Sequence, residues 1–344
     1  MILIRSLLGG YGLLFLLLTL VACQEDEEAV PTYQPALMEI PEGFPDVLFP
    51  EGNEFTKARW ELGKKLFYDP VMSADSSISC ASCHDPALAF SDQVALSLGV
   101  EQRPGTRNAP TLANVAYHPY FTREGGVPTL EMQVLVPIQE HNEFDFNILL
   151  VAERLAADSQ YVHLAAEAYG RPPDAFVITR SLACFERSLL SGTSPYDQYL
   201  HGGNSTMLSA AALRGMDLFF NERTQCSQCH SGFNFTNYAF ENNGLYEVYA
   251  DEGRFRLTHD STDLARFKVP TLRNIELTAP YMHDGAFPTL ESVIEHYQAG
   301  GKNNPHKSTL IGPLYLSEQE KQDLLEFLKS LTDETFVNNP LFRK

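Results

Sequence analysis

Two copies of one short cysteine–histidine motif constrain this chain more than any other feature. The first copy is Cys-Ala-Ser-Cys-His at residues 80–84, and the second is Cys-Ser-Gln-Cys-His at residues 226–230. The pattern Cys-x-x-Cys-His is typical of c-type haem attachment, in which two thiols bind the porphyrin and the next residue, a histidine, ligates the iron. The sequence therefore predicts two covalently bound haem c groups. The residues expected to hold them are Cys80, Cys83, His84, Cys226, Cys229 and His230.

Zinc, disulfide and redox-dithiol sites also use paired cysteines, but they explain this pattern less well. The two pairs of a zinc ribbon usually lie about 15–20 residues apart, whereas Cys83 and Cys226 are far more widely separated in this chain. None of these alternatives requires a histidine directly after each pair. Outside the two motifs, Cys184 lies in an apolar helical run and is expected to be a small buried thiol.

The N-terminal segment is typical of an exported protein. Residues 1–22 combine Arg5 with a short apolar run, and they end in Leu-Val-Ala before Cys23. This ending resembles a bacterial lipobox, so we expect Cys23 to carry lipid; an ordinary signal or an anchoring helix is the alternative. Residues 23–50 are acidic, contain proline and are expected to form a solvated tether. Bacteria attach c-type haem outside the cytoplasmic membrane, which predicts a periplasmic or cell-envelope protein, lipid-anchored to a membrane.

The net charge of −19 makes nucleic acid an unfavourable partner, because the chain would repel the phosphate backbone. An acidic surface would instead attract a basic protein or keep the chain soluble.

Apolar residues recur mainly at helical spacing, and no strand-rich region is evident. A predicted helix precedes each haem motif, which indicates a mainly α fold with two cytochrome c-like haem lobes packed against each other and joined by long loops. We expect an N-terminal haem domain over residues 51–200 and a C-terminal one over residues 201–344. The predicted helices cover residues 54–68, 146–169, 174–191, 207–220, 289–298 and 317–331.

Two polar residues after the first motif are candidates for proton chemistry. Gln133 lies on a short helix that Thr129 is expected to cap and Pro137 to end, and Glu143 follows shortly afterwards. Each alone is best interpreted as a solvated residue. As a pair they matter more, because cleavage of a peroxide requires a group that moves a proton between its two oxygens.

With these motifs, the chain resembles the bacterial di-haem cytochrome c peroxidases, including their MauG-type relatives. The resemblance runs from about residue 52 to 335. Its most specific segments are residues 78–84, 107–111, 267–274 and 277–285.

The resemblance implies a division of labour between the haems. The haem on His84 would react with hydrogen peroxide, and the haem on His230 would accept electrons from a small cytochrome c or cupredoxin. Glu143 would move the proton and Gln133 would orient peroxide. The implied reaction reduces hydrogen peroxide to water.

Three positions depart from the pattern of many family members. Val100 follows Ser-Leu-Gly where those members have a histidine that blocks the peroxidatic iron, so we expect an open site unless His118 or His141 fills it. Arg123 stands where the family has a tryptophan between the haems, and arginine cannot carry an electron hole. The position of the sixth ligand of the second haem falls on Tyr297, with Met282 as the alternative.

The resemblance also implies a calcium ion between the lobes, held by Asn108, Thr278 and Pro280, partly through backbone carbonyls. Relatives often form homodimers, so a homodimer is possible. Two other functions stay open: a MauG-type oxidase that uses peroxide on a protein or small molecule, and a non-catalytic di-haem electron carrier.

Overall fold

The computed structural model describes residues 37–344. The predicted export signal, the predicted lipidation site Cys23 and the first part of the tether lie outside the described residues. Within residues 37–344, no helix has the length and apolar character that a membrane crossing requires.

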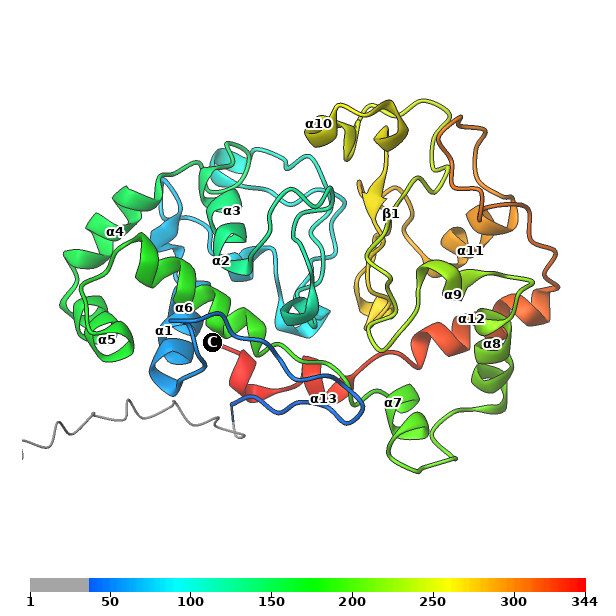
Figure 1. The fold of residues 1–344 in the computed structure, drawn as a ribbon, viewed down its shortest axis with the longest axis horizontal. Helices are drawn as coiled ribbons and strands as arrows, with labels where there is room; N and C mark the ends of the chain where they lie inside the picture. The colour runs from blue at the N-terminus through cyan, green and yellow to red at the C-terminus, as the bar shows by residue number, and fades with distance from the viewer. Residues whose placement is uncertain (1–36) are drawn as a thin grey trace, which may run out of the picture. The chain divides into compact units, whose positions relative to one another are not determined.

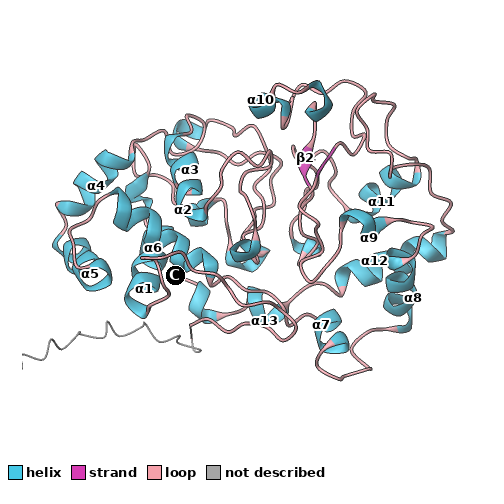
Figure 2. Ribbon diagram, in the orientation of Figure 1, coloured by secondary structure: helices cyan, strands magenta, loops and turns pink. Residues whose placement is uncertain are grey.

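The described chain is mainly helical, as the sequence predicts (Figure 2). The two strands, β1 (Phe240–Glu241) and β2 (Phe267–Lys268), form one short antiparallel ladder. The helices are α1 (Lys57–Tyr68), α2 (Leu130–Gln133), α3 (Leu135–Gln139), α4 (Ile148–Ala156), α5 (Ser159–Tyr169), α6 (Ala175–Arg187), α7 (Pro195–Leu200), α8 (Ala210–Phe220), α9 (Cys226–Cys229), α10 (Phe255–Thr258), α11 (Leu290–Gln298), α12 (Glu318–Lys329) and α13 (Glu334–Val337).

Side-chain caps set the starts of the long helices. Asp174 accepts a hydrogen bond from the Val177 amide at the start of α6, and Ser317 forms a capping box with Glu320 at the start of α12. The predicted helix over residues 146–169 is two helices, α4 and α5, because the Asp158 side chain caps a new helix at Ser159.

Pro137 does not end the helix that carries Gln133, contrary to the prediction. The interruption lies at Val134, and Pro137 occupies the first turn of α3. An amide in the first turn has no partner within its own helix, so proline fits there without the loss of a hydrogen bond.

The two haem motifs each follow a helix that crosses a partner helix closely. In the first lobe α1 packs on α6, and a Cβ at Gly63 would overlap the Ser181 carbonyl. In the second lobe α8 packs on α12, and a Cβ at Gly215 would overlap the Asp323 carbonyl. Figure 1 shows α1 to α6 gathered in one half, and α8, α9, α11 and α12 in the other. The predicted pair of helical lobes is thereby confirmed.

Each lobe has its own apolar core. The first core includes Leu66 and Phe185, both with no exposed surface, and the second includes Phe327 and Leu331, likewise fully buried. The first core also contains Phe336, Val337 and Phe342 from the end of the chain. The C-terminal segment therefore leaves the second lobe and completes the core of the first.

A second internal repeat lies in the loops, with an offset of 160 residues. The short 3₁₀ turns at Val115–Tyr117 and Ile275–Leu277 each follow an asparagine with positive φ, at positions 114 and 274. Isolated antiparallel bridges join Phe121 to Val127 and Tyr281 to Phe287. The helices α2 and α11 then begin after equivalent threonine caps. The two lobes thus repeat a loop design as well as the haem motif.

Candidate active site

In the first haem motif, the His84 ring uses Nδ1 in a hydrogen bond and leaves Nε2 without one. Residues Cys80–Ser82 form a 3₁₀ turn, and the His84 Nδ1 atom lies 2.8 Å from the Phe90 carbonyl oxygen. A histidine that uses Nδ1 in this way has a fixed tautomer, and its Nε2 is left for a metal. Burial lowers the pKa of the His84 imidazole, which favours the neutral form that can ligate iron.

The second motif repeats this arrangement on α9. The His230 Nδ1 atom lies 3.1 Å from the Phe235 carbonyl oxygen, and burial lowers the pKa of this imidazole as well. All four motif cysteines are free thiols, partly exposed and available for covalent attachment. The donor sets at both motifs therefore fit haem c.

Aromatic packing positions the carbonyl that orients His84. Phe90 is fully buried, and its ring centroid lies 5.7 Å from that of Phe336 and 6.0 Å from that of Phe342. Phe67 of α1 packs on its other side, with centroids 5.8 Å apart. The end of the chain thereby supports the backbone that fixes the first haem ligand.

The predicted proton-carrying pair lies on the α2–α3 segment and the loop behind it. Gln133 is the last residue of α2, and its buried Oε1 atom accepts no hydrogen bond within the described chain. Glu143 is an exposed residue, yet desolvation of its carboxyl raises the pKa to about 7, with a further contribution from the charge of Glu140. A buried amide oxygen without a partner and a carboxyl that titrates near neutral pH are suited to bind and deprotonate a small polar substrate.

Val100 is fastened to the Glu143 backbone. Its amide donates to the Glu143 carbonyl over 2.9 Å, and its side chain is only 3% exposed. Glycine is required at position 99 because a Cβ there would overlap the Asn142 carbonyl oxygen. The residue in place of the family's blocking histidine is thus a buried valine next to Glu143, without an atom that ligates iron.

The two histidines considered as replacements lie elsewhere. His141 has a side chain that is 68% exposed and pairs with Asp145 over 3.2 Å. His118 packs against Tyr238, with ring centroids 5.2 Å apart, and its Nδ1 atom lies 3.5 Å from the Lys268 amine. Neither residue is hydrogen-bonded to Glu143 or Gln133.

The candidate sixth ligands of the second haem gather around Asn243. The Asn243 amide donates to the Met282 sulfur over 3.1 Å, and Tyr249 donates to Asn243 Oδ1 over 3.2 Å. Tyr297 lies on α11, where burial raises the pKa of its phenol to about 12 while the Asn243 side chain opposes the shift. The Met282 thioether is therefore already engaged as a hydrogen-bond acceptor.

Comparison with known proteins agrees with this geometry. Residues 57–205 match the model of the di-haem cytochrome c peroxidase family. The methylamine utilization protein MauG of Methylorubrum extorquens is 38% identical over 289 residues, which is 83% of this chain and 81% of that protein. The cytochrome c551 peroxidase of Nitrosomonas europaea is 31% identical over 283 residues, 80% of each chain.

The chain belongs to the di-haem cytochrome c peroxidase family. The crystal structure of a MauG-like protein associated with microbial copper homeostasis superposes with a TM-score of 0.84 at 34% identity, covering 89% of this chain and 98% of that one. The protein is thus a di-haem peroxidase, an oxidoreductase that acts on peroxide, and the predicted pair of haem c groups is confirmed.

In this di-haem peroxidase, two reciprocal backbone hydrogen bonds join the lobes. The Asn108 amide donates to the His283 carbonyl over 2.9 Å, and the Lys268 amide donates to the Arg123 carbonyl over 2.6 Å. These are equivalent positions of the repeat, because 268 follows 108 and 283 follows 123 by the same 160 residues. The interface therefore has an approximate twofold character, with Arg123 and His283 at matching positions.

The residues predicted to bind calcium give a poor donor set for that ion. The Asn108 carbonyl oxygen lies 2.6 Å from Arg123 Nη2, and its Oδ1 atom lies 3.3 Å from the same nitrogen. At Thr278 and Pro280 the backbone carbonyls are the predicted ligands, and the Thr278 hydroxyl donates to the Ile275 carbonyl. A divalent ion about 4 Å from a guanidinium is repelled by roughly 8 kcal/mol at an effective dielectric constant near 20. Within residues 37–344, no cluster of three or more His, Cys, Asp or Glu residues could hold a metal.

Two residues with ionisable side chains lie in the cores in arrangements that sequence reasoning did not predict. Arg273 is 1% exposed and binds both oxygens of Asp197, over 2.8 and 2.9 Å, and it also donates to the Phe233 carbonyl. Glu186 lies on α6, and burial raises the pKa of its carboxyl to about 8. When ionised, this carboxyl helps to raise the pKa of the Cys80 thiol, after the larger effect of burial. The position of Glu186 within the apolar run that ends α6 could have indicated a buried carboxyl. The pairing of Arg273 with Asp197 could not be recognised, because the two residues are far apart in the sequence.

Proposed function

We propose that the first lobe reduces hydrogen peroxide to water, with Glu143 as the group that carries the proton. The observation that supports this most is the pKa of the Glu143 carboxyl, which is raised to about 7. The backbone carbonyl of Glu143 accepts a hydrogen bond from the Val100 amide, which keeps the two residues next to each other. A residue with this pKa accepts and returns a proton at neutral pH with little cost in either direction. A haem bound through Cys80, Cys83 and His84 would supply the iron and the electrons that the reaction needs.

The other residues of the first lobe bind and orient. Gln133 presents a buried carbonyl oxygen that lacks a partner, so it can accept a hydrogen bond from the O–H of peroxide. Glu143 would take the proton from the near oxygen of peroxide and deliver it to the far one, so that the O–O bond breaks and the far oxygen leaves as water. Two electrons from the donor, passed through the haems, and two protons from solvent would reduce the near oxygen to the second water. Val100 keeps the space beside Glu143 free of a competing ligand.

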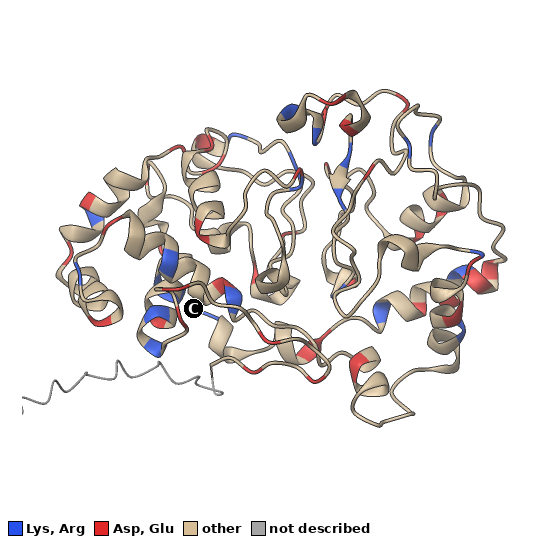
Figure 3. Ribbon diagram, in the orientation of Figure 1, with Lys and Arg blue, Asp and Glu red and all other residues tan. Residues whose placement is uncertain are grey.

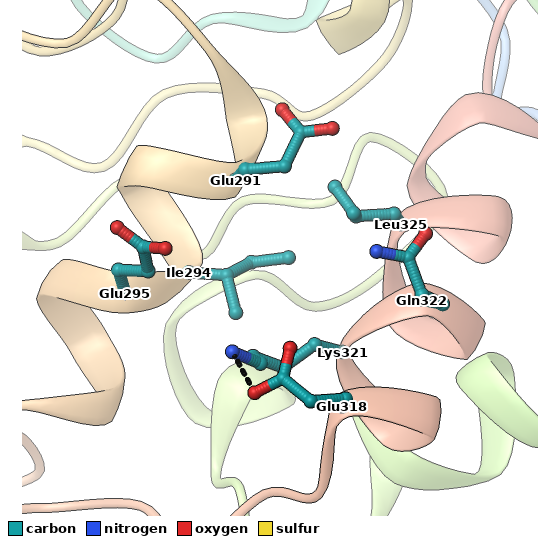
Figure 4. Close-up of a pocket in the computed structure, with 7 residues that line it drawn as sticks. All are labelled: Glu291, Ile294, Glu295, Glu318, Lys321, Gln322 and Leu325. Atoms are coloured by element: carbon teal, nitrogen blue, oxygen red, sulfur yellow. Dashed lines mark ion pairs between the residues drawn. The ribbon is translucent and has the colours of Figure 1, made fainter.

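The second lobe would receive electrons. Cys226, Cys229 and His230 attach the second haem in this proposal, and a small cytochrome c or cupredoxin is the donor. Acidic side chains are spread over this lobe, notably on α12 (Figure 3). A surface cleft between α11 and α12 carries Glu291, Glu295 and Glu318 against one lysine (Figure 4). This cleft contains none of the predicted site residues, but its charge favours a basic donor.

We infer Tyr297 rather than Met282 as the sixth ligand of the second haem. Asn243 interacts with both side chains, but the buried Tyr297 phenol on α11 stands at the position that the resemblance assigns to the ligand. Iron would lower the pKa of this phenol and bind it as phenolate.

The same observation favours a second candidate function, a MauG-type oxidase that uses peroxide to oxidise a protein or small molecule. A phenolate ligand stabilises oxidised iron more than a thioether does, which suits an enzyme that stores oxidising equivalents.

We propose that the enzyme works in the bacterial cell envelope, anchored by lipid on Cys23 after removal of residues 1–22. Mass spectrometry of the mature N-terminus tests this. An unmodified Cys23, or a mature chain that begins elsewhere, would contradict it. The predicted calcium ion is not part of the proposed function, because Arg123 already binds the Asn108 oxygens.

Electron paramagnetic resonance of the fully oxidised protein tests the proposed function. We expect a high-spin ferric signal from one haem that stoichiometric peroxide removes, together with turnover of peroxide in the presence of a reduced small cytochrome. Two low-spin signals that peroxide leaves unchanged, without turnover in the half-reduced protein, would instead identify an electron carrier. Turnover without any small donor, but with an oxidised protein substrate, would identify the oxidase.

A further inference from the structure

We propose that the guanidinium of Arg123 takes the place of the expected calcium ion on the Asn108 oxygens at the lobe interface, so that this site holds no metal ion. The proposal concerns the interface and is independent of the roles assigned to Glu143 and Gln133.

The first step is the position of Arg123 in the chain's own repeat. Its carbonyl accepts the Lys268 amide, and the matching residue of the other lobe, His283, accepts the Asn108 amide. Arg123 thus lies on a loop segment whose backbone is hydrogen-bonded across the interface. This hydrogen bond fixes the position of the Arg123 backbone and thereby limits the region that its side chain can reach.

The second step is the direction in which the guanidinium points. Nη2 lies 2.6 Å from the Asn108 carbonyl oxygen and 3.3 Å from Asn108 Oδ1. The side-chain nitrogen of Asn108, Nδ2, donates to the Val94 carbonyl over 3.0 Å, so the side-chain amide is oriented with its oxygen toward Arg123. One cationic group therefore collects two oxygens of a single residue, as a bound cation would.

The third step is the charge balance around the interface. The carboxylates of Glu124 and Asp251 bind Arg107 directly, and Asp284 accepts a hydrogen bond from Tyr246 over 2.7 Å. The nearby carboxylates are therefore already committed to partners. A divalent cation on the Asn108 oxygens would lie next to the Arg123 guanidinium, while these three carboxylates already have other partners.

The fourth step is the burial of the guanidinium. Its Nε atom is buried and has no hydrogen-bond partner within the described chain. The two Asn108 oxygens are therefore the acceptors that hold the guanidinium in place.

Calcium analysis of the wild-type protein with both haems attached tests the proposal directly. The protein is incubated with calcium chloride or with EGTA, desalted, and analysed for calcium by mass spectrometry, and its melting temperature is measured in both solutions. We expect no stoichiometric calcium and the same melting temperature in both. Stoichiometric calcium that survives desalting, or a melting temperature that falls in EGTA, would overturn the proposal.

Two variants test the role of the guanidinium itself. Arg123→Gln removes the charge and keeps a donor, and Arg256→Gln removes the charge of an exposed arginine of α10 as a matched control. We expect the melting temperature to fall for Arg123→Gln and to stay at the wild-type value for the control. An Arg123→Gln protein as stable as wild type would overturn the proposal; if this variant fails to fold, the calcium analysis of the wild type still decides.

Discussion

Replacement of Glu143 by glutamine gives the sharpest test of the proton-carrying role. To accept a proton from peroxide, Glu143 has to be deprotonated in the free enzyme. With a pKa of about 7, the carboxylate fraction at two pH units below that value is roughly 1%. The kcat/KM for peroxide should therefore be near its plateau at alkaline pH and fall about 100-fold at the lower pH.

Glu143→Gln should lower kcat/KM at the plateau by about 10²- to 10⁴-fold, the usual contribution of a positioned acid–base group. It should also abolish the acidic limb, because glutamine does not titrate. The assay is steady-state peroxide turnover with a reduced cytochrome as donor, over a range of pH. Haem absorption spectra recorded alongside establish that both haems are still attached.

A neighbouring glutamate allows the electrostatic argument to be checked separately. The charge of Glu140 helps to raise the pKa of Glu143, so Glu140→Gln should move the acidic limb toward lower pH while the plateau stays near the wild-type rate. Glu153→Gln, which removes an exposed charge on α4, is the matched control and should leave the profile unchanged. A Glu143→Gln enzyme with wild-type turnover, or one that keeps the same acidic limb, would refute the reasoning.

Four further changes have definite expected outcomes. Val100→His should restore a ligand beside Glu143, convert the high-spin signal to low spin and suppress peroxide binding in the oxidised enzyme; an unchanged spectrum would contradict the assigned position. Tyr297→Phe should change the spectrum of the second haem and leave that of the first unaltered, and unchanged resonance signals would exclude this ligand. Arg273→Met should cost about 3–5 kcal/mol in denaturant unfolding, because it leaves the 4%-exposed Asp197 carboxylate without its partner. Arg223 pairs with Glu320 at the surface, where solvent screens the charges, and its replacement should cost far less stability; equal losses from Arg273→Met and Arg223→Met would refute the burial argument. Phe336→Ala should destabilise the protein by about 3–5 kcal/mol and shift the signal of the haem on His84, while the second haem stays unchanged; a shift in the second haem alone would contradict this packing.

Local features of the sequence were sufficient to predict the helices and the haem motifs. The caps at Asp174 and Ser317 act over three residues, and the helical spacing of apolar residues extends over each helix, so both are visible without knowledge of the fold. The mainly α fold and the pair of haems followed from such features. Pro137 was misinterpreted because its effect depends on whether it lies at the start or in the middle of a helix.

Features that depend on distant residues could not be predicted in the same way. The hydrogen bond from Arg123 to Asn108 and the pair formed by Arg273 with Asp197 join segments whose proximity is set by the packed loops. The raised pKa of Glu143 likewise follows from the protein atoms packed around it. The repeat with an offset of 160 residues was present in the sequence, for instance in Pro-Thr-Leu at residues 110–112 and again at 270–272. The residue roles at the haems and the domain boundary between residues 200 and 201 stay predictions. The calcium ion is also untested, and the Arg123 guanidinium is proposed in its place.

The return of the C-terminal segment to the first lobe has a consequence for how this protein is assembled. Phe336 and Phe342 pack on Phe90, whose carbonyl oxygen orients His84. During synthesis the first haem motif emerges well before these residues, so the first lobe cannot complete its core until nearly the whole chain has been made. The segment around the first motif therefore lacks part of its packing throughout that interval. Closure of the first lobe then becomes a late step, one that also waits for the second lobe to emerge.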